Sequence, residues 1–291
     1  MDALELKLCD IQGRLFELFA KTEYDAESLV KAFMNGEIAK NSVIEAINAG
    51  YRHIDTAFAY GNETAVGEGI RATGIARDEI FVTTKHWVTM RGYEKATEAI
   101  DISLKNLGLD YIDLYLIHWP CVEKVSPDWQ EINAGTWKAF EDAYKSGKIR
   151  AIGVSNFQKK HYDALVERCE IKPMVNQIEF HPGYTQPETV AYSQENGMLV
   201  QAFSPLGCGA VLGDETLASI ARKYNKTVAQ ICLSHSIAAT APVPTAKHGQ
   251  DQEQDDDAPV ATEHAAIVVS VSIGNSCDVS RSKIFHFKFL S

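Results

Sequence analysis

Short apolar runs and longer amphipathic runs alternate along most of this chain. From about residue 27 to residue 240, β-prone stretches are separated by stretches with apolar residues at helical spacing. The pattern predicts strands at 51–57, 80–85, 112–119, 149–156, 174–180 and 199–206. It predicts helices at 63–73, 93–107, 136–146, 161–169, 187–195, 214–224 and 227–238.

This alternation predicts an α/β fold with parallel strands joined by right-handed crossovers. Gly108, Gly147 and Gly197 each stand just past an expected helix, where a left-handed C-cap favours glycine. An open doubly wound sheet would carry a glycine-rich phosphate turn after its first strand, and none is present. We therefore expect a (β/α)8 TIM barrel, a fold that typically needs about 250 residues.

Both ends of the chain depart from the repeat. Residues 4–8 and 15–20 predict an N-terminal β-hairpin whose second arm also supplies the first barrel strand. The sequential candidate for the eighth strand, 241–245, contains Pro242 and Pro244 and is a poor strand. The acidic stretch 249–264 predicts disorder, and the β-prone stretches 265–273 and 284–290 have no helix between them.

These features predict a barrel domain at 1–245 and a divergent, partly disordered acidic tail at 246–291, with barrel closure open. One alternative is that 265–273 fills the gap out of sequence order. Another is that the chain does not fold stably, because an unclosed barrel exposes two strand edges.

Charge and composition narrow the class of partner. The 291 residues carry a formal charge of −11 with a pI near 5.3, which argues against nucleic acid and acidic membranes as partners. No signal segment or membrane-length apolar run appears, so we expect a soluble, cytoplasmic monomer that binds a small molecule. The six cysteines form no C-x-x-C pair or metal-ligand spacing, which predicts reduced thiols and no metal site.

Polar residues end nearly every expected strand. Active sites of β/α barrels lie at the carboxyl ends of the strands, so these residues are candidates for the chemistry. In chain order they are Asp55, Tyr60, Lys85, His118, Ser155, Asn156, Gln177, Glu179 and Ser204.

Four of these residues form a candidate proton-transfer set. A phenol has an unperturbed pKa of about 10, and a neighbouring ammonium makes its proton easier to give up. Lys85 would supply that cation for Tyr60, Asp55 would hold the lysine by a salt bridge, and His118 would orient a substrate oxygen. Each residue alone is more typical of a turn, a surface or the core; their joint placement at strand ends favours catalysis.

Six fragments in order make the chain resemble the aldo-keto reductase family over about residues 40–238. They are GYRHIDTAFAYGNE, FVTTKHW, IDLYLIHWP, IRAIGVSNF, VNQIEFHP and QAFSPLG. The resemblance implies reduction of aldehydes or ketones inside a (β/α)8 barrel, with NADP(H), or alternatively NAD(H), as the cofactor. It also implies that Tyr60 is the acid, with Lys85, Asp55 and His118 as its partners.

The resemblance further implies a cofactor site and a substrate pocket. Trp87 and Trp119 would bind the substrate. Ser155, Asn156 and Gln177 would hold the nicotinamide carboxamide. The remaining expected cofactor residues are Thr56, Phe203, which would stack on the ring, and Ser204, Leu206 and Gly207, which would line the pyrophosphate.

Two departures from the family pattern keep an alternative open. The family's first strand reads L-G-x-G-T, whereas 15–22 here reads LFELFAKT. The family clamps the adenosine 2′-phosphate with a late P-K-S segment and a following arginine, whereas 243–257 here reads VPTAKHGQDQEQDDD. The aspartates would repel a phosphate, so the alternative function is a catalytically impaired barrel acting as a binding or scaffold protein.

Overall fold

The structure is a computed structural model that describes residues 36–240, 268–270 and 289–290. Four expected features lie outside the described residues: the hairpin 4–8 and 15–20, the first barrel strand at its second arm, the strand 241–245 and the acidic stretch 249–264. The division into domains at residue 245 stays a prediction. Within the described ranges, no helix has the length and apolar content that crossing a bilayer would require.

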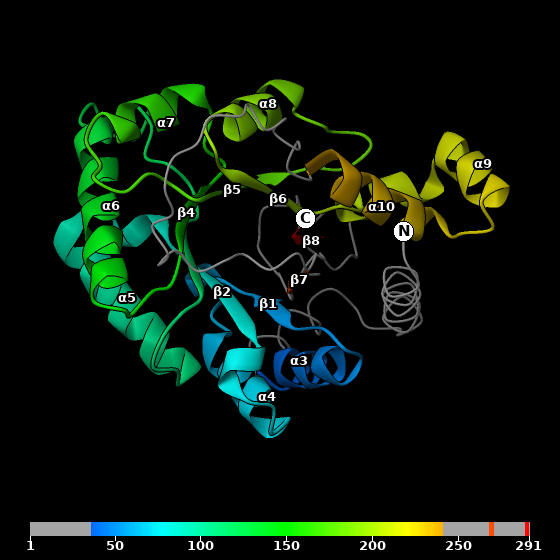
Figure 1. Ribbon diagram of the computed structural model, residues 1–291, viewed down its shortest axis with the longest axis horizontal. Helices are drawn as coiled ribbons and strands as arrows, with labels where there is room; N and C mark the ends of the chain where they lie inside the picture. Colours follow the sequence, from blue (N-terminus) through cyan, green and yellow to red (C-terminus); the bar gives the residue numbers. More distant parts are fainter. Residues whose placement is uncertain (1–35, 241–267, 271–288, 291) are drawn as a thin grey trace, which may run out of the picture.

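Six parallel strands form a curled sheet in the order in which they occur along the chain (Figure 1). Each lies inside a range expected from the sequence or overlaps it with a shift of one residue, so all six predicted strands are confirmed. They are β1 (His53–Asp55), β2 (Phe81–His86), β3 (Leu114–Ile117), β4 (Ile152–Ser155), β5 (Val175–Glu179) and β6 (Leu199–Phe203).

Two short strands extend the sheet at its edges. β7 (Val268–Ser270) pairs parallel with β1, as the out-of-order alternative predicts, and β8 (Phe289–Leu290) pairs antiparallel with β6. The sheet order is therefore β7-β1-β2-β3-β4-β5-β6-β8. Among the described residues no ladder joins β7 to β8, so closure of the barrel stays open, as it was from the sequence.

The helices alternate with the strands, and α3 to α8 lie along the outer side of the curved sheet (Figure 1). Their bounds are α3 (Glu37–Asn48), α4 (Glu63–Ala72), α5 (Tyr93–Leu107), α6 (Trp129–Lys145), α7 (Lys159–Val166), α8 (Pro187–Glu195), α9 (Glu215–Lys223) and α10 (Val228–Thr240). Together with the parallel strands, this arrangement is that of a (β/α)8 barrel fold.

Helix α3 was missing from the predicted elements, although its apolar spacing is helical. Its buried residues Ala39, Val43, Ala46 and Ile47 follow one face of the helix.

Helix α6 begins seven residues before the expected start, because Asn133 makes two hydrogen bonds to the backbone of Cys121. This tertiary contact stabilises the early part of α6, which the local sequence does not mark.

Alternation along the strands separates the core from the site. Ile54 and Val82 lie in the apolar layer between sheet and helices, whereas Asp55 and Lys85, on the same two strands, point to the opposite side. Gly67 allows α4 to approach the end of α5, because a Cβ there would lie 1.9 Å from the carbonyl oxygen of Leu107. The two helices thereby pack closely against each other on the outer side of the sheet.

Candidate active site

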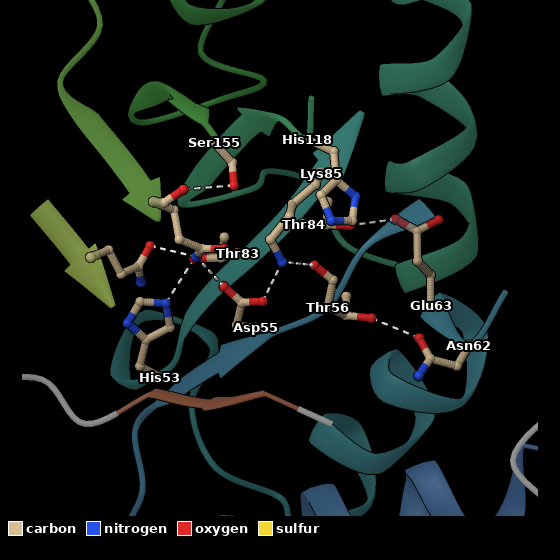
Figure 2. Close-up of polar contacts among 12 residues, drawn as sticks. His53, Asp55, Thr56, Asn62, Glu63, Thr83, Thr84, Lys85, His118 and Ser155 are labelled. Carbon is tan, nitrogen blue, oxygen red and sulfur yellow. Dashed lines mark hydrogen bonds and ion pairs between the residues drawn. The ribbon is translucent and has the colours of Figure 1, made fainter. Parts of the chain in front are cut away.

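Lys85 and Asp55 form a fully buried ion pair at the ends of β1 and β2 (Figure 2). The Nζ atom of Lys85 donates to Oδ1 of Asp55 and, at 2.6 Å, to the carbonyl oxygen of Thr56. Both side chains have no exposed surface. Because a buried charge needs an opposite charge and hydrogen bonds, the two groups hold each other in the ionised form.

The second carboxylate oxygen of Asp55 is bound by an amide. Nε2 of Gln177 on β5 donates to Oδ2 of Asp55 at 2.7 Å and to Oε1 of Gln201 on β6 at 2.6 Å. Gln201 was not among the predicted site residues. The available signal was a lone polar residue in an apolar strand, and the register of β5 and β6 in the structure places Gln201 beside Gln177.

Tyr60 lies next to this ion pair. It ends the short 3₁₀ helix η1 (Phe58–Tyr60) that follows β1, and its ring centroid is 5.5 Å from Nζ of Lys85. The ring of His118 meets it edge-on, with the two centroids 5.7 Å apart. The structure therefore brings together all four members of the predicted proton-transfer set.

His118 is fixed from both neighbouring strands. Its backbone nitrogen donates to the carbonyl oxygen of His86 at 3.2 Å, and its carbonyl oxygen accepts from Nδ2 of Asn156 at 2.9 Å. The ring of half-buried Trp87 packs against its imidazole at 5.2 Å between centroids. Trp119, the next residue along the chain, is 44% exposed.

The loop that carries Tyr60 is tied down by a second set of buried polar groups. The Thr56 hydroxyl donates to Oδ1 of Asn62 at 2.7 Å. Glu63, buried at the start of α4, accepts from the Thr84 hydroxyl at 2.7 Å (Figure 2). Its other carboxylate oxygen accepts from Nδ2 of Asn106 at 3.1 Å. Asn62 and Glu63 were missed, although Glu63 falls on the buried face of α4.

Ser155 and Asn156 lie at the end of β4, next to Gln177. The Ser155 hydroxyl donates to the carbonyl oxygen of Gln177 at 2.8 Å, and Nδ2 of Asn156 also donates to the Ser155 oxygen at 3.1 Å. Asn156 has a left-handed backbone, with φ of 63°. Its two amide hydrogens are thus used within the protein, which leaves Oδ1 to accept from an outside NH2 group.

The remaining predicted cofactor residues lie at the end of β6 and in the loop after it. Phe203 is half-buried, whereas Ser204, Leu206 and Gly207 are buried. Ser204 and Gly207 have φ of 51° and 55°, and the Gly207 nitrogen donates to the Ser204 carbonyl at 2.8 Å. A Cβ on Gly207 would lie 3.2 Å from the ring of His181, so the loop passes close to that ring.

Two buried histidines near the site are held neutral. His53, on β1, bonds through Nε2 to the Thr83 hydroxyl at 2.7 Å, and burial lowers its pKa to about 3. Burial also lowers the pKa of His86 to about 4, despite its 2.6 Å contact with the Met90 carbonyl oxygen. These two imidazoles therefore add no charge beside the Lys85 ammonium at neutral pH.

Asn156 fits the NH2 end of a nicotinamide carboxamide. Oδ1 of Asn156 can accept from the carboxamide NH2. The amide of Gln177, the other expected partner, is directed in this structure toward Asp55 and Gln201. The loop expected to line the pyrophosphate has a left-handed backbone at Ser204 and Gly207.

Comparison with known proteins identifies the class to which this fold and site belong. The Aldo/keto reductase family model matches residues 26–256. The chain is 51% identical to glyoxal reductase of Bacillus subtilis over 68% of this chain and 69% of that protein. It is 46% identical to 9,11-endoperoxide prostaglandin H2 reductase of Trypanosoma cruzi, over 70% of each chain.

Solved structures agree with this class. An aldo/keto reductase from Brucella melitensis superposes with a TM-score of 0.66 at 44% identity, covering 72% of this chain and 78% of the other. A Bombyx mori aldo-keto reductase in complex with NADP gives a TM-score of 0.62 at 40% identity, covering 74% and 72%.

The protein is thus an oxidoreductase with a β/α barrel that acts on carbonyl groups. The chain belongs to the aldo/keto reductase family, whose members use NAD(P)H.

Proposed function

We propose that this protein reduces small aldehydes and ketones to alcohols, with Tyr60 as the general acid. The observation that carries the proposal is the position of the Lys85 ammonium, 5.5 Å from the Tyr60 ring centroid. A cation at this position favours the phenolate and so makes the phenol a better proton donor to a substrate oxygen.

Asp55 keeps that cation in place. Lys85 is fully buried, so it would lose its charge without an anionic partner. Asp55 accepts from Lys85 with one oxygen and from Gln177 with the other. The ammonium is thereby held charged and aimed, and the proton of Tyr60 can be given up without a large rearrangement.

His118 and Trp87 form the side of the site that faces the substrate. The edge-on contact between His118 and Tyr60 places the imidazole where it can orient the carbonyl oxygen for protonation. Trp87 supports that imidazole and supplies an apolar wall that limits water. Trp119 would extend the wall when a substrate covers it.

The cofactor is proposed to bind along the carboxyl ends of β4 to β6. Bound NADPH or NADH supplies the hydride for the carbonyl carbon. Asn156 and Ser155 would hold the carboxamide. Gln177 would assist through the oxygen of its amide while its Nε2 atom keeps the contacts with Asp55 and Gln201. Thr56 would contribute through the backbone contact that fixes Lys85. The residues proposed for the ring and pyrophosphate are Phe203, Ser204, Leu206 and Gly207.

For the substrate class we propose small dicarbonyl and simple aldehyde compounds. The support is the similarity over two thirds of the chain to a relative named glyoxal reductase. The preference between NADPH and NADH, the monomeric state and the cytoplasmic location stay predictions from sequence.

The test is the Tyr60→Phe variant assayed with glyoxal and NADPH or NADH. We expect the turnover number to fall by roughly 100-fold or more, because the phenol proton is lost while the ring remains. Cofactor fluorescence titration of the same variant should give an unchanged affinity. Wild-type turnover in Tyr60→Phe would reject the mechanism, and failure of the unmodified chain to bind either cofactor would favour the scaffold alternative.

A further inference from the structure

The amide of Gln201 lies at the inner end of the hydrogen-bond chain that starts at Lys85. Its side chain is completely buried, and its backbone is in register with that of Gln177 on the neighbouring strand. Oε1 of Gln201 accepts from the same nitrogen of Gln177 that donates to Asp55. Gln201 is therefore linked to Asp55, the partner of Lys85, through two hydrogen bonds that share the Gln177 nitrogen.

The shared nitrogen gives Gln201 control over the orientation of Gln177. A glutamine amide can present either its NH2 group or its oxygen to a neighbour. With NH2 directed inward, Gln177 satisfies two acceptors, one on Asp55 and one on Gln201. The reversed orientation would place an oxygen against the Asp55 carboxylate, so the acceptor of Gln201 favours the orientation that stabilises Asp55.

The Nε2 end of the Gln201 amide also indicates that this residue serves Gln177. Its Nε2 atom is buried and meets no hydrogen-bond acceptor among the described residues. A buried glutamine serving only as a polar filler would be expected to use both ends of its amide. In the described part of the chain, Gln201 is used as an acceptor for Gln177.

We propose that Gln201 is a positioning residue for the reduction: by fixing the Gln177 amide, it holds Asp55 and, through Asp55, the Lys85 ammonium beside Tyr60. This inference rests on the proposed function. It assigns no contact between Gln201 and the substrate.

The test compares variants that remove or keep the acceptor. Gln201→Met has a similar length without an acceptor, and we expect about a tenfold lower turnover number with little change in the carbonyl KM. Gln201→Glu keeps an oxygen acceptor, and because a charged carboxylate is costly in this buried position it should be protonated and recover most of that loss. Gln201→Asn withdraws the acceptor while staying polar, so it replaces the methionine variant if that protein does not fold.

A double-mutant cycle separates positioning from general destabilisation. In an Asp55→Asn background the same Gln201→Met change should lower the residual turnover less than about twofold, because the carboxylate that it orients is absent. Equal losses in both backgrounds would overturn the inference. Thr83→Val is the matched control. It removes a buried hydroxyl that is bonded to His53 and takes no part in the hydrogen bonds from Lys85 to Gln201, so it should leave turnover unchanged.

Failure of the role proposed for Gln201 can be distinguished from failure of the proposed function. If Tyr60→Phe retains the wild-type rate, the general-acid assignment is wrong whatever Gln201 does. If Tyr60→Phe loses activity while Gln201→Met and Gln201→Asn keep the wild-type rate, only the role of Gln201 is rejected.

Discussion

Lys85 and Asp55 form an ion pair in which neither side chain has any exposed surface. The partners come from adjacent parallel strands, and the β1–β2 register places Asp55 next to Thr83, two residues before Lys85. The pair is thus built into the sheet itself, whereas Tyr60 is brought to it by a loop.

Removing one charge of this pair should harm stability more than removing both. Lys85→Met leaves a carboxylate buried without its cation, which typically costs about 3–5 kcal/mol. The double variant Lys85→Met, Asp55→Asn has no buried charge and should unfold at a higher urea concentration than Lys85→Met alone. Both should lose carbonyl reduction, and an order of stability opposite to this one would show that the pair is not desolvated in solution.

Asp113 should be a second structural centre, outside the site. Its buried carboxylate accepts from Arg77 at 2.6 Å, from Arg150 at 3.0 Å and from the Val82 backbone nitrogen at 2.9 Å. Asp113→Asn should lower the free energy of unfolding by about 3 kcal/mol, because it removes the negative charge that two guanidinium groups share.

The matched control for Asp113 is Asp101, whose ion pair with Lys148 is exposed. Asp101→Asn should leave the unfolding midpoint nearly unchanged, since exposed pairs contribute little. Similar midpoints for the Asp101 and Asp113 variants would contradict the structural role of Asp113.

The neutral histidines predict an acid-sensitive fold. The unfolded chain protonates His53 below its ordinary pKa of about 6.5, whereas the folded chain does so only near a pKa of about 3. Stability is therefore fully present above about pH 6.5 and is lost as the pH falls toward 3, by at most about 1.4 kcal/mol per pH unit from this residue.

His53→Gln removes this titration. Its free energy of unfolding, measured in urea between pH 4 and 7, should fall less steeply with decreasing pH than that of the unmodified protein. Parallel curves for the two proteins would mean that His53 has the same pKa in the folded and unfolded states, which would contradict its burial as a neutral imidazole. His86, whose pKa is about 4, should give the same effect over a narrower range.

Gly67→Ala tests the close approach of α4 and α5. The added Cβ would overlap the Leu107 carbonyl oxygen, which is backbone and cannot rotate away. The helices must separate, so we expect a loss of about 2 kcal/mol or more in unfolding free energy. Gly213→Ala, where nothing lies within 4 Å of the new Cβ, should be nearly neutral.

The sequence predicts the parts of the molecule that obey local rules. The six strands were found because their apolar runs are bounded by polar residues, and Asp55, Lys85 and His118 were found because strand ends converge in a barrel. The glycine caps were also correct, with φ of 63° at Gly108, 79° at Gly147 and 75° at Gly197.

What the sequence does not show depends on pairing across the sheet. Gln201 looks like one polar residue in an apolar strand until its register with Gln177 is known. The approach of β7 to β1 depends on a segment far from β1 in sequence, which local propensity does not position. The early start of α6 depends on the Cys121 backbone, for the same reason.

The contact between Gln177 and Asp55 joins residues 122 positions apart in the sequence. A ribosome must therefore complete β5 before the carboxylate on β1 receives its second partner, and folding must close a long loop before the contact is gained. Neither half of the chain contains the assembled centre. If the two halves were expressed as separate polypeptides, catalysis would return only on their association, and its onset would report the moment at which the halves dock.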